Sequence, residues 1–271
     1  MIFIKILFVL VTLYIAFYNR NMLYRRFKSR FEMVGGNDSL GVDMIYCITM
    51  KNREDYVRKQ MGGLGCPYKM FHAITPNDLS YLDYFVMSST YIPYRNPGIY
   101  RKFTRLPVGL SFFMCYLDAY KNGYKTIMVL EDDIKFNASI EELKKTIGEW
   151  KSTYCKVMYM GYCHLNCDKA RYKELTPTVH QVISEQKMVC NHALLIKREM
   201  LEKYFQIFHF WYMDRQNDNV LDKFVRSNNI SRCVPPRGYI QQNVPMLGSN
   251  NENKNDKLHT CHVKTNTKFF D

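Results

Sequence analysis

From residue 44 onward, short runs of consecutive apolar residues alternate with segments in which apolar residues recur at helical spacing. Runs rich in β-branched and aromatic residues predict strands, and apolar residues three or four positions apart predict helices. The predicted strands cover 44–49, 68–74, 126–130 and 157–160, and the predicted helices cover 54–61, 110–120 and 139–150. Ser139 and Glu142 form a capping-box pattern at the start of the last helix. This alternation predicts an α/β fold with a mainly parallel sheet flanked by helices.

The amino-terminal part of the chain has a different pattern. Residues 1–19 are mostly apolar, with Lys5 as their one charged residue, and a basic segment follows them. This stretch predicts a single membrane anchor, and a cleaved or uncleaved signal peptide is the alternative. We expect residues 20–41 to be a basic juxtamembrane segment and linker, residues 42–250 one globular domain, and residues 251–271 a polar tail.

The orientation of the predicted anchor follows from the charges beside it. Lys5 lies near its amino-terminal end, whereas five basic residues follow the anchor: Arg20, Arg25, Arg26, Lys28 and Arg30. The positive-inside rule therefore places the globular domain in the cytosol. The 9 cysteines form no regular framework, which also favours a reducing compartment. Three N-glycosylation sequons, at Asn37, Asn137 and Asn229, indicate the opposite side. On balance we expect a single-pass membrane protein whose globular domain faces the cytosol rather than a lumen.

The formal net charge of +13 favours an anionic partner: a nucleic acid, an acidic membrane face or a phosphorylated substrate. The basic residues are spread along the chain, and no zinc-finger, helix-turn-helix or RNA-recognition pattern is present. We therefore expect no nucleic-acid partner.

Three consecutive acids, Glu131, Asp132 and Asp133, end the predicted strand 126–130. Carboxylates at the end of a buried strand are costly unless a positive group or hydroxyl groups lie opposite them. Oxygen ligands of this kind suit Mg2+ or Mn2+, and they also suit the hydroxyls of a nucleotide sugar. In parallel sheets ligands bind at the carboxyl ends of strands, where these acids lie. A solvated acidic loop is the alternative.

Four segments around these acids resemble glycosyltransferase family 25, which includes bacterial lipooligosaccharide galactosyltransferases and the collagen galactosyltransferase domain. They are the first strand and its basic turn at 45–53, Phe71-His72-Ala73-Ile74, Gly109-Leu110-Ser111, and Val129-Leu130-Glu131-Asp132-Asp133-Ile134. Looser likenesses are 190–196, Asp218, Gln241 and Ser249. The chain departs from the family pattern at Thr49-Met50, Tyr56 and Phe112.

The resemblance implies a GT-A-like nucleotide-sugar-binding fold over residues 42–250 and transfer of a sugar, of the galactose or glucose type, from a UDP-sugar. The acceptor would be a hydroxyl of a glycan, glycolipid or glycoprotein, and the transfer would invert the anomeric carbon. Asp133, with Asp132, would bind Mn2+ or Mg2+, and Asp132 or Glu131 would hold the ribose. Lys51 and Arg53 would meet the nucleotide or its diphosphate, and a solvated turn is the alternative for this pair.

The resemblance also implies a carboxylate that takes the acceptor proton. Asp218 is the first candidate for this catalytic base and Asp214 the second. Other functions remain open: an inactive transferase-like membrane adaptor, or a metal-dependent phosphotransferase or nuclease. A zinc site built from Cys155, Cys163, His164 and Cys167, with Cys190 or His192, is a further alternative, although their spacing fits no paired zinc knuckle.

Overall fold

The structure is a computed structural model that describes residues 20–80, 83, 98–163, 172–183, 188–207 and 217–242. The predicted anchor 1–19 and the predicted tail 251–271 lie outside the described residues. Within them, no helix combines the length and the apolar character that crossing a membrane requires.

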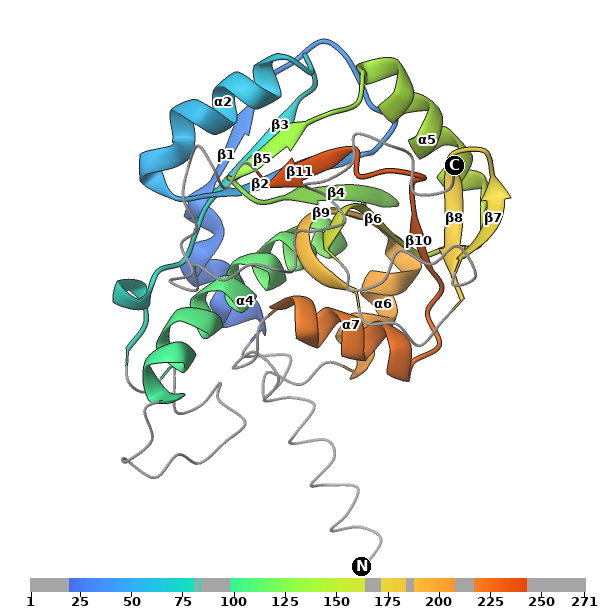
Figure 1. Ribbon diagram of the computed structural model, residues 1–271. Helices are drawn as coiled ribbons and strands as arrows, with labels where there is room; N and C mark the ends of the chain where they lie inside the picture. Colours follow the sequence, from blue (N-terminus) through green and yellow to red (C-terminus); the bar gives the residue numbers. More distant parts are fainter. Residues whose placement is uncertain are drawn as a thin grey trace, which may run out of the picture.

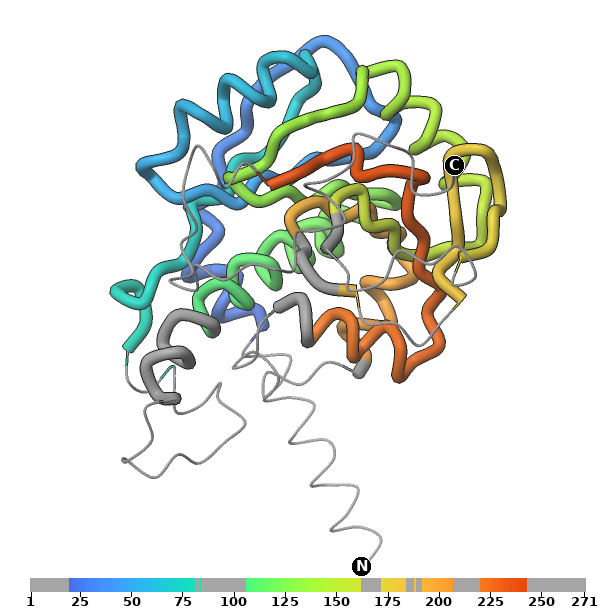
Figure 2. Tube along the Cα trace, in the orientation of Figure 1, coloured from blue at the N-terminus to red at the C-terminus, as the bar shows by residue number. Residues whose placement is uncertain are grey.

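A nine-stranded sheet with the order β1-β3-β2-β4-β9-β6-β10-β8-β7 forms the centre of the molecule. Its strands are β1 (Phe31–Val34), β2 (Met44–Thr49), β3 (Tyr68–His72), β4 (Thr126–Leu130), β6 (Val157–Cys163), β7 (Tyr172–Thr176), β8 (Val179–Val182), β9 (Val189–Lys197) and β10 (Arg232–Val234). Two short strands, β5 (Ile134–Phe136) and β11 (Ile240–Gln242), pair antiparallel in a second sheet. In the tube trace the red β11 segment runs beside the green β5 segment (Figure 2).

The direction of the strands partly matches the prediction. Strand β2 is parallel to β3 and β4, and β6 is parallel to β10. Strand β9 lies between β4 and β6 and is antiparallel to both, so β4 and β6 run in the same direction. Strand β1 is antiparallel to β3 at one end of the sheet. The sheet is therefore mixed, with most strands in one direction and an antiparallel strand near its centre.

Helices cover both faces of the sheet (Figure 1). They are α2 (Glu54–Gly62), α4 (Gly98–Lys121), α5 (Ile140–Ser152), α6 (Arg198–Ile207) and α7 (Asn217–Ser227). Side chains of α2 and α5 pack with one set of alternate strand residues, such as Ile45 and Met128. Side chains of α4, α6 and α7 pack with the other set, such as Tyr46 and Val129. Because successive strand residues point to opposite faces, both faces of β2 and β4 are buried.

Several predicted elements are confirmed. Strands β2 and β4 have the predicted bounds, and the capping box of Ser139 and Glu142 begins α5. Helix α4 is longer than predicted and contains Pro107. Two 3-10 turns, η2 (Lys51–Arg53) and η3 (Pro76–Asp78), follow β2 and β3 along the chain.

The predicted linker within residues 20–41 is wrong, because this segment is built into the domain. Residues 20–27 are helical and bury Leu23 and Phe27, and the 3-10 turn η1 (Lys28–Arg30) leads into β1. Strand β1 pairs with β3 along its whole length. The Tyr24 hydroxyl also donates a 2.6 Å hydrogen bond to the buried Asp118 on α4. These apolar and paired residues make the segment part of the core.

A disulfide joins Cys155, which lies two residues before β6, to Cys233 in the neighbouring strand β10. This pairing was not expected from the cysteine pattern. It also removes Cys155 from the alternative zinc site, whose residues His164 and Cys167 lie outside the described residues. Cys47, Cys66 and Cys115 are free and buried.

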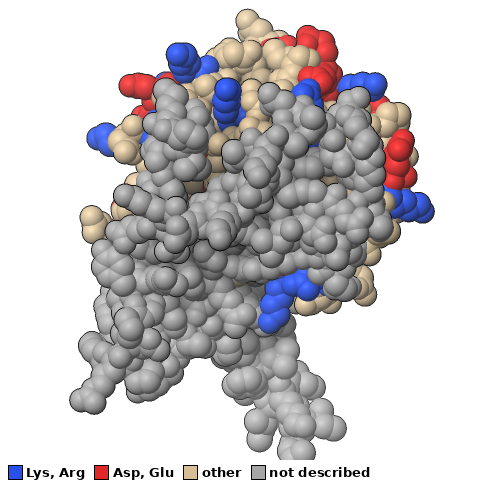
Figure 3. All heavy atoms as spheres, viewed as in Figure 1, with Lys and Arg blue, Asp and Glu red and all other residues tan. Residues whose placement is uncertain are grey.

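Charged side chains of both signs lie among one another over the described part of the face in Figure 3. Basic side chains are thus dispersed among acidic ones on this part of the face.

Candidate active site

The acidic segment forms a turn between β4 and β5. Strands β2 and β4 are parallel neighbours, so the chain that leaves β2 lies beside the chain that leaves β4. The register pairs Cys47 with Leu130, which places Met50 and η2 next to Asp132. The sequence prediction that these acids end a buried strand at its carboxyl end is therefore confirmed.

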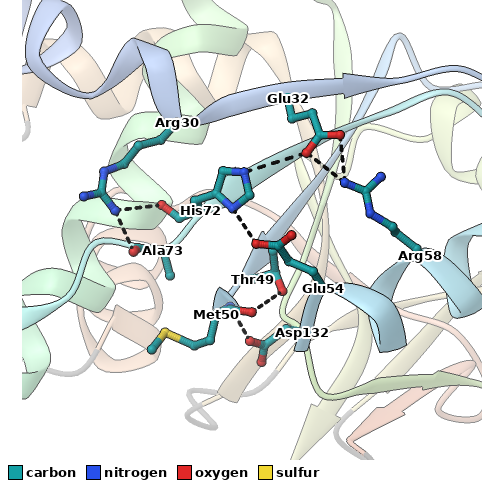
Figure 4. Close-up of polar contacts among 9 residues, drawn as sticks. All are labelled: Arg30, Glu32, Thr49, Met50, Glu54, Arg58, His72, Ala73 and Asp132. Atoms are coloured by element: carbon teal, nitrogen blue, oxygen red, sulfur yellow. Dashed lines mark hydrogen bonds and ion pairs between the residues drawn. The ribbon is translucent and has the colours of Figure 1, made fainter. Parts of the chain in front are cut away.

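Asp132 is held by the turn that follows β2. Its Oδ2 accepts a 2.7 Å hydrogen bond from the Met50 backbone N–H, and its Oδ1 accepts one of 2.7 Å from Arg53 Nη1. Figure 4 shows Asp132 facing Met50, with Thr49 beside them. Asp132 and Arg53 are only 7% and 6% exposed. Since both carboxylate oxygens have donors, the structure gives Asp132 the role of joining β2 to β4.

In the structure Arg53 pairs with Asp132, and its predicted contact with a nucleotide or diphosphate stays a prediction. Its Nη1 also lies 3.9 Å from Asp133 Oδ2, so one guanidinium faces two carboxylates. Removing either partner of such a buried ion pair leaves an uncompensated charge and destabilises the fold. Arg53 therefore stabilises the position of both acids.

Asp133 is the acid that retains an unused oxygen. Its Oδ1 is buried and has no hydrogen-bond partner. Burial raises the pKa of Asp133 to about 6, the negative charge of Asp132 adds to the shift, and Arg53 opposes it. The carboxylate therefore lies in a setting that disfavours its own negative charge.

Glu131 is positioned by strands β9 and β11. Its backbone N–H donates to the His192 carbonyl, and its Oε2 lies 3.4 Å from Gln242 Nε2. Gln242 also bonds to Asp133. His192 Nε2 is 3.0 Å from the carbonyl oxygen of Ile240, which fixes β11 against β9. The resemblance had singled out Gln241, the neighbour of the glutamine that reaches the acids.

Lys51 and His72 lie beside this turn. Lys51 is exposed on η2. His72 Nδ1 is 3.1 Å from Glu54, and its Nε2 is 3.8 Å from Glu32, which in turn binds Arg58 (Figure 4). These half-exposed pairs link β1, β3 and α2, and pairs of this kind contribute little individually.

The structure does not describe the side chains of the two predicted catalytic bases. Asp218 belongs to α7, but its side chain is outside what the structure describes, and Asp214 lies outside the described residues altogether. Ser249 lies outside them as well. One turn after Asp218, the buried Asp222 accepts hydrogen bonds from the Met188 N–H and from Arg226 and Arg232. Asp222 was missed because one of many helix acids carries no burial signal in the sequence.

Whether the site fits a divalent metal depends on which carboxylate oxygens are available as ligands. The orphaned Asp133 Oδ1 is a suitable ligand, whereas both oxygens of Asp132 are already engaged. Among the described residues no group of three or more His, Cys, Asp or Glu side chains could hold a metal. The residues therefore fit an ion bound by one carboxylate and completed by phosphate oxygens and water, as Mg2+ is often bound.

The molecule is an α/β protein whose sheet is covered by helices on both faces, with acids at the carboxyl end of a central strand. In sheets of this type ligands bind at the carboxyl ends of the strands. The family model of glycosyltransferase family 25 (LPS biosynthesis protein) matches residues 43–220. The chain therefore belongs to glycosyltransferase family 25, a family of sugar-transferring enzymes. The matched residues include the acidic turn, Met50 and Arg53.

Two solved structures show weaker likenesses. A UDP-glucose pyrophosphorylase complexed with UDP-glucose has a TM-score of 0.40 and 8% identity, over 72% of this chain and 90% of that one. A glucose-1-phosphate thymidylyltransferase from Bacillus anthracis in complex with a sucrose has a TM-score of 0.34 and 10% identity, over 70% and 66%. No curated protein matches the chain. The family model alone therefore carries the assignment.

Proposed function

We propose that the chain transfers a sugar from a UDP-sugar, of the galactose or glucose type, to an acceptor hydroxyl, with inversion at the anomeric carbon. In this proposal the acceptor is a glycan, glycolipid or glycoprotein. The domain binds the nucleotide sugar as a GT-A-like fold does. Membership of the family supports sugar transfer. The observation that carries the site is the orphaned Oδ1 of Asp133 at the carboxyl end of β4.

The negative charge of the acidic turn would attract a metal ion, which would neutralise a diphosphate leaving group. Glu131, Asp132 and Asp133 carry three formal negative charges, and the Arg53 guanidinium faces two of them, Asp132 and Asp133. A Mn2+ or Mg2+ ion held by Asp133 would supply Lewis-acid neutralisation of the diphosphate. Arg53 keeps Asp133 in place, and the exposed Lys51 binds the diphosphate from the η2 side.

Glu131 is proposed as the ribose contact, because Gln242 and the His192 carbonyl hold it in position. Asp218, or in second place Asp214, remains the proposed base for the acceptor proton. A base must come within hydrogen-bond reach of the acceptor hydroxyl. Because it acts on the acceptor and not on UDP, its removal should abolish sugar transfer and leave UDP binding intact. Asp218→Asn is the variant for that test.

The proposal is tested by calorimetric titration of the full chain with UDP, with and without Mn2+. We expect binding that requires the metal, and we expect Asp133→Asn to weaken it at least about tenfold, roughly 1.4 kcal/mol. Asp38→Asn is the matched control, because Asp38 is exposed and pairs with Lys144 away from the acidic turn. The control should bind UDP like the wild type.

Other outcomes decide against the proposal. Metal-independent UDP binding that survives in Asp133→Asn would remove the proposed metal site. A folded protein that binds no nucleotide would instead be the transferase-like adaptor. A phosphotransferase or nuclease would use further acidic ligands, and the described part of the chain holds no cluster of three that could bind a metal.

A further inference from the structure

The three sequons differ in whether their amide nitrogen can carry a glycan. Asn37 is exposed in the loop after β1, and Asn229 is exposed at the end of α7, where its φ of 51° is left-handed. Asn137, by contrast, buries its Nδ2. An N-linked glycan is attached through this nitrogen and is bulky and hydrated, so it requires a surface position. The fold therefore accommodates a glycan at Asn37 and Asn229 but not at Asn137.

The two exposed sequons also lie away from the candidate active site. Val34 at the end of β1 pairs with Tyr68 at the start of β3, so Asn37 lies where β2, β3 and β4 begin. Asn229 precedes β10, whose first residue Arg232 pairs with the first residue of β6, a strand that runs in the direction of β4. Both positions are thus at the end of the sheet opposite the acidic turn.

The disulfide is an independent observation that points to the same compartment. Cys155 and Cys233 are both fully buried, and their Cα atoms are 6.1 Å apart, within the ordinary range for a disulfide. Cys233 follows the sequon serine, Ser231, by two residues. Disulfides form and persist in oxidising compartments such as the lumen of the secretory pathway and are rare in the cytosol.

Two of the five basic residues behind the cytosolic prediction, Arg26 and Arg30, have partners inside the fold. Arg26 donates hydrogen bonds to Asp83 and to the Asp78 carbonyl. Arg30 pairs with Asp78 and donates to the carbonyls of His72 and Ala73. The positive-inside rule describes charges that interact with the cytosolic side of a membrane. Charges that stabilise the domain carry less information about its orientation.

We propose that the globular domain lies in an oxidising, glycosylating compartment and carries N-linked glycans at Asn37 and Asn229, while Asn137 stays unmodified. At each site the amide nitrogen loses a proton and bonds to the anomeric carbon of an oligosaccharide, which leaves its lipid diphosphate carrier. Formation of the disulfide passes two electrons and two protons from the thiols to a disulfide-exchange oxidant of that compartment. The inference does not depend on the proposed UDP-sugar chemistry.

The test is expression of the full chain in a eukaryotic cell, followed by peptide mass spectrometry before and after enzymatic glycan release. We expect glycopeptides at Asn37 and Asn229, and each variant, Asn37→Gln and Asn229→Gln, should lose one glycan by gel mobility. Asn137→Gln is the matched control and should leave the mobility unchanged. Mapping on the wild-type protein keeps the result independent of how well the variants fold.

Thiol labelling of the denatured, non-reduced protein supplies the second measurement. Cys155 and Cys233 should be protected until a reductant is added, whereas Cys47, Cys66 and Cys115 should react at once. A glycan at Asn37 or Asn229 together with this protection supports the proposal. Absence of a glycan from both, a glycan at Asn137, or free thiols at Cys155 and Cys233 would overturn it.

Discussion

At the scale of single residues, Asp222 shows how much one buried charge can matter. Its carboxylate is fully buried and accepts hydrogen bonds from the Met188 N–H, Arg226 and Arg232. Asp222→Asn removes the charge that Arg232 needs, and Arg232 is itself 5% exposed. We expect a loss of about 3–5 kcal/mol in the free energy of unfolding, measured by urea denaturation.

The control for Asp222 is Glu202→Gln. Glu202 forms an exposed i,i+4 pair with Arg198, and such pairs contribute at most about 0.5 kcal/mol. If Asp222→Asn costs no more than this control, the Asp222 network does not stabilise the fold.

His180 provides a pH dependence at the same scale. Burial lowers the pKa of His180, and Glu174, whose Oε2 is 3.9 Å from its Nε2, opposes the shift in part. Below about pH 6.5 the unfolded chain binds a proton at this residue that the folded protein does not bind. The free energy of unfolding should therefore fall as the pH drops below about 6.5, until the folded pKa is reached.

This dependence is measured by urea denaturation at about pH 7.5 and about pH 5.5, in the wild type and in His180→Gln. The variant should lose part of the difference between the two pH values, because Gln does not titrate. An unchanged difference would mean that His180 does not contribute to the acid sensitivity.

The residues of the candidate site were only partly predictable. The position of Asp133 at the end of a buried strand follows from the apolar run before it. The pairing of Arg53 with Asp132 does not follow, because a basic residue in that turn can face either a ligand or the acids. The Met50 N–H is a backbone group, and its direction depends on how η2 turns. The residue types in the sequence do not show which group Arg53 faces or where the Met50 N–H points.

At the scale of elements, β6, β9 and β11 meet at Gly161. A Cβ added there would lie 2.1 Å from His192 Nε2 and 2.1 Å from the Ile240 carbonyl oxygen. Gly161→Ala should therefore push β11 away from β9 and displace Gln242 from the acids. We expect a loss of about 1–3 kcal/mol in the free energy of unfolding, together with weaker UDP binding.

The matched control is Gly148→Ala within α5. Nothing lies within 4 Å of a Cβ at this position, and alanine is favoured over glycine in a helix by about 1 kcal/mol. This variant should be more stable than the wild type and bind UDP normally. If both glycine variants behave alike, the close packing at Gly161 does not position β11.

The elements differ in how well their sequence predicts them. Strands β2 and β4 are short apolar runs buried on both faces, and the capping box marks the start of α5, so these were predicted closely. The start of α4 was missed because Pro107 usually interrupts a helix, yet α4 continues on both sides of it. An apolar run predicts a strand but not its direction, which is why the antiparallel β9 was not foreseen.

At the scale of the whole molecule, the domain begins earlier than its sequence suggested. The boundary was expected at residue 42, after a glycine-containing segment that resembles a linker. The sheet nevertheless extends to β1, and Tyr24 and Tyr46 share the carboxylate of Asp118 with Lys69. The network joins the helix at 20–27 to α4, β2 and β3. Contacts between residues so far apart in the chain leave no local pattern in the sequence. They can be recognised only in the folded structure.

The domain boundary can be tested with two truncations. A chain that begins at residue 20 keeps every described contact, whereas one that begins at residue 35 loses helix 20–27 and β1. Burial of Leu23 and Phe27 alone is worth roughly 1.5–3 kcal/mol for each side chain. Their sum of about 3–6 kcal/mol reaches the lower end of the total stability of about 5–15 kcal/mol that is typical of a domain. The longer chain should therefore unfold cooperatively, and the shorter one should unfold at a much lower temperature or aggregate.

Thermal unfolding followed by circular dichroism distinguishes these outcomes, with size-exclusion chromatography as a check for aggregates. Loss of β1 also exposes the edge of β3, and an unpaired strand edge favours association with other chains. The shorter chain should therefore elute as larger species even where it retains helical signal. Equal midpoints and equal elution for both truncations would contradict this reasoning and restore the boundary at residue 42. A stable shorter chain would also show that the Tyr24–Asp118 hydrogen bond is dispensable, since Tyr46 and Lys69 would still hold Asp118.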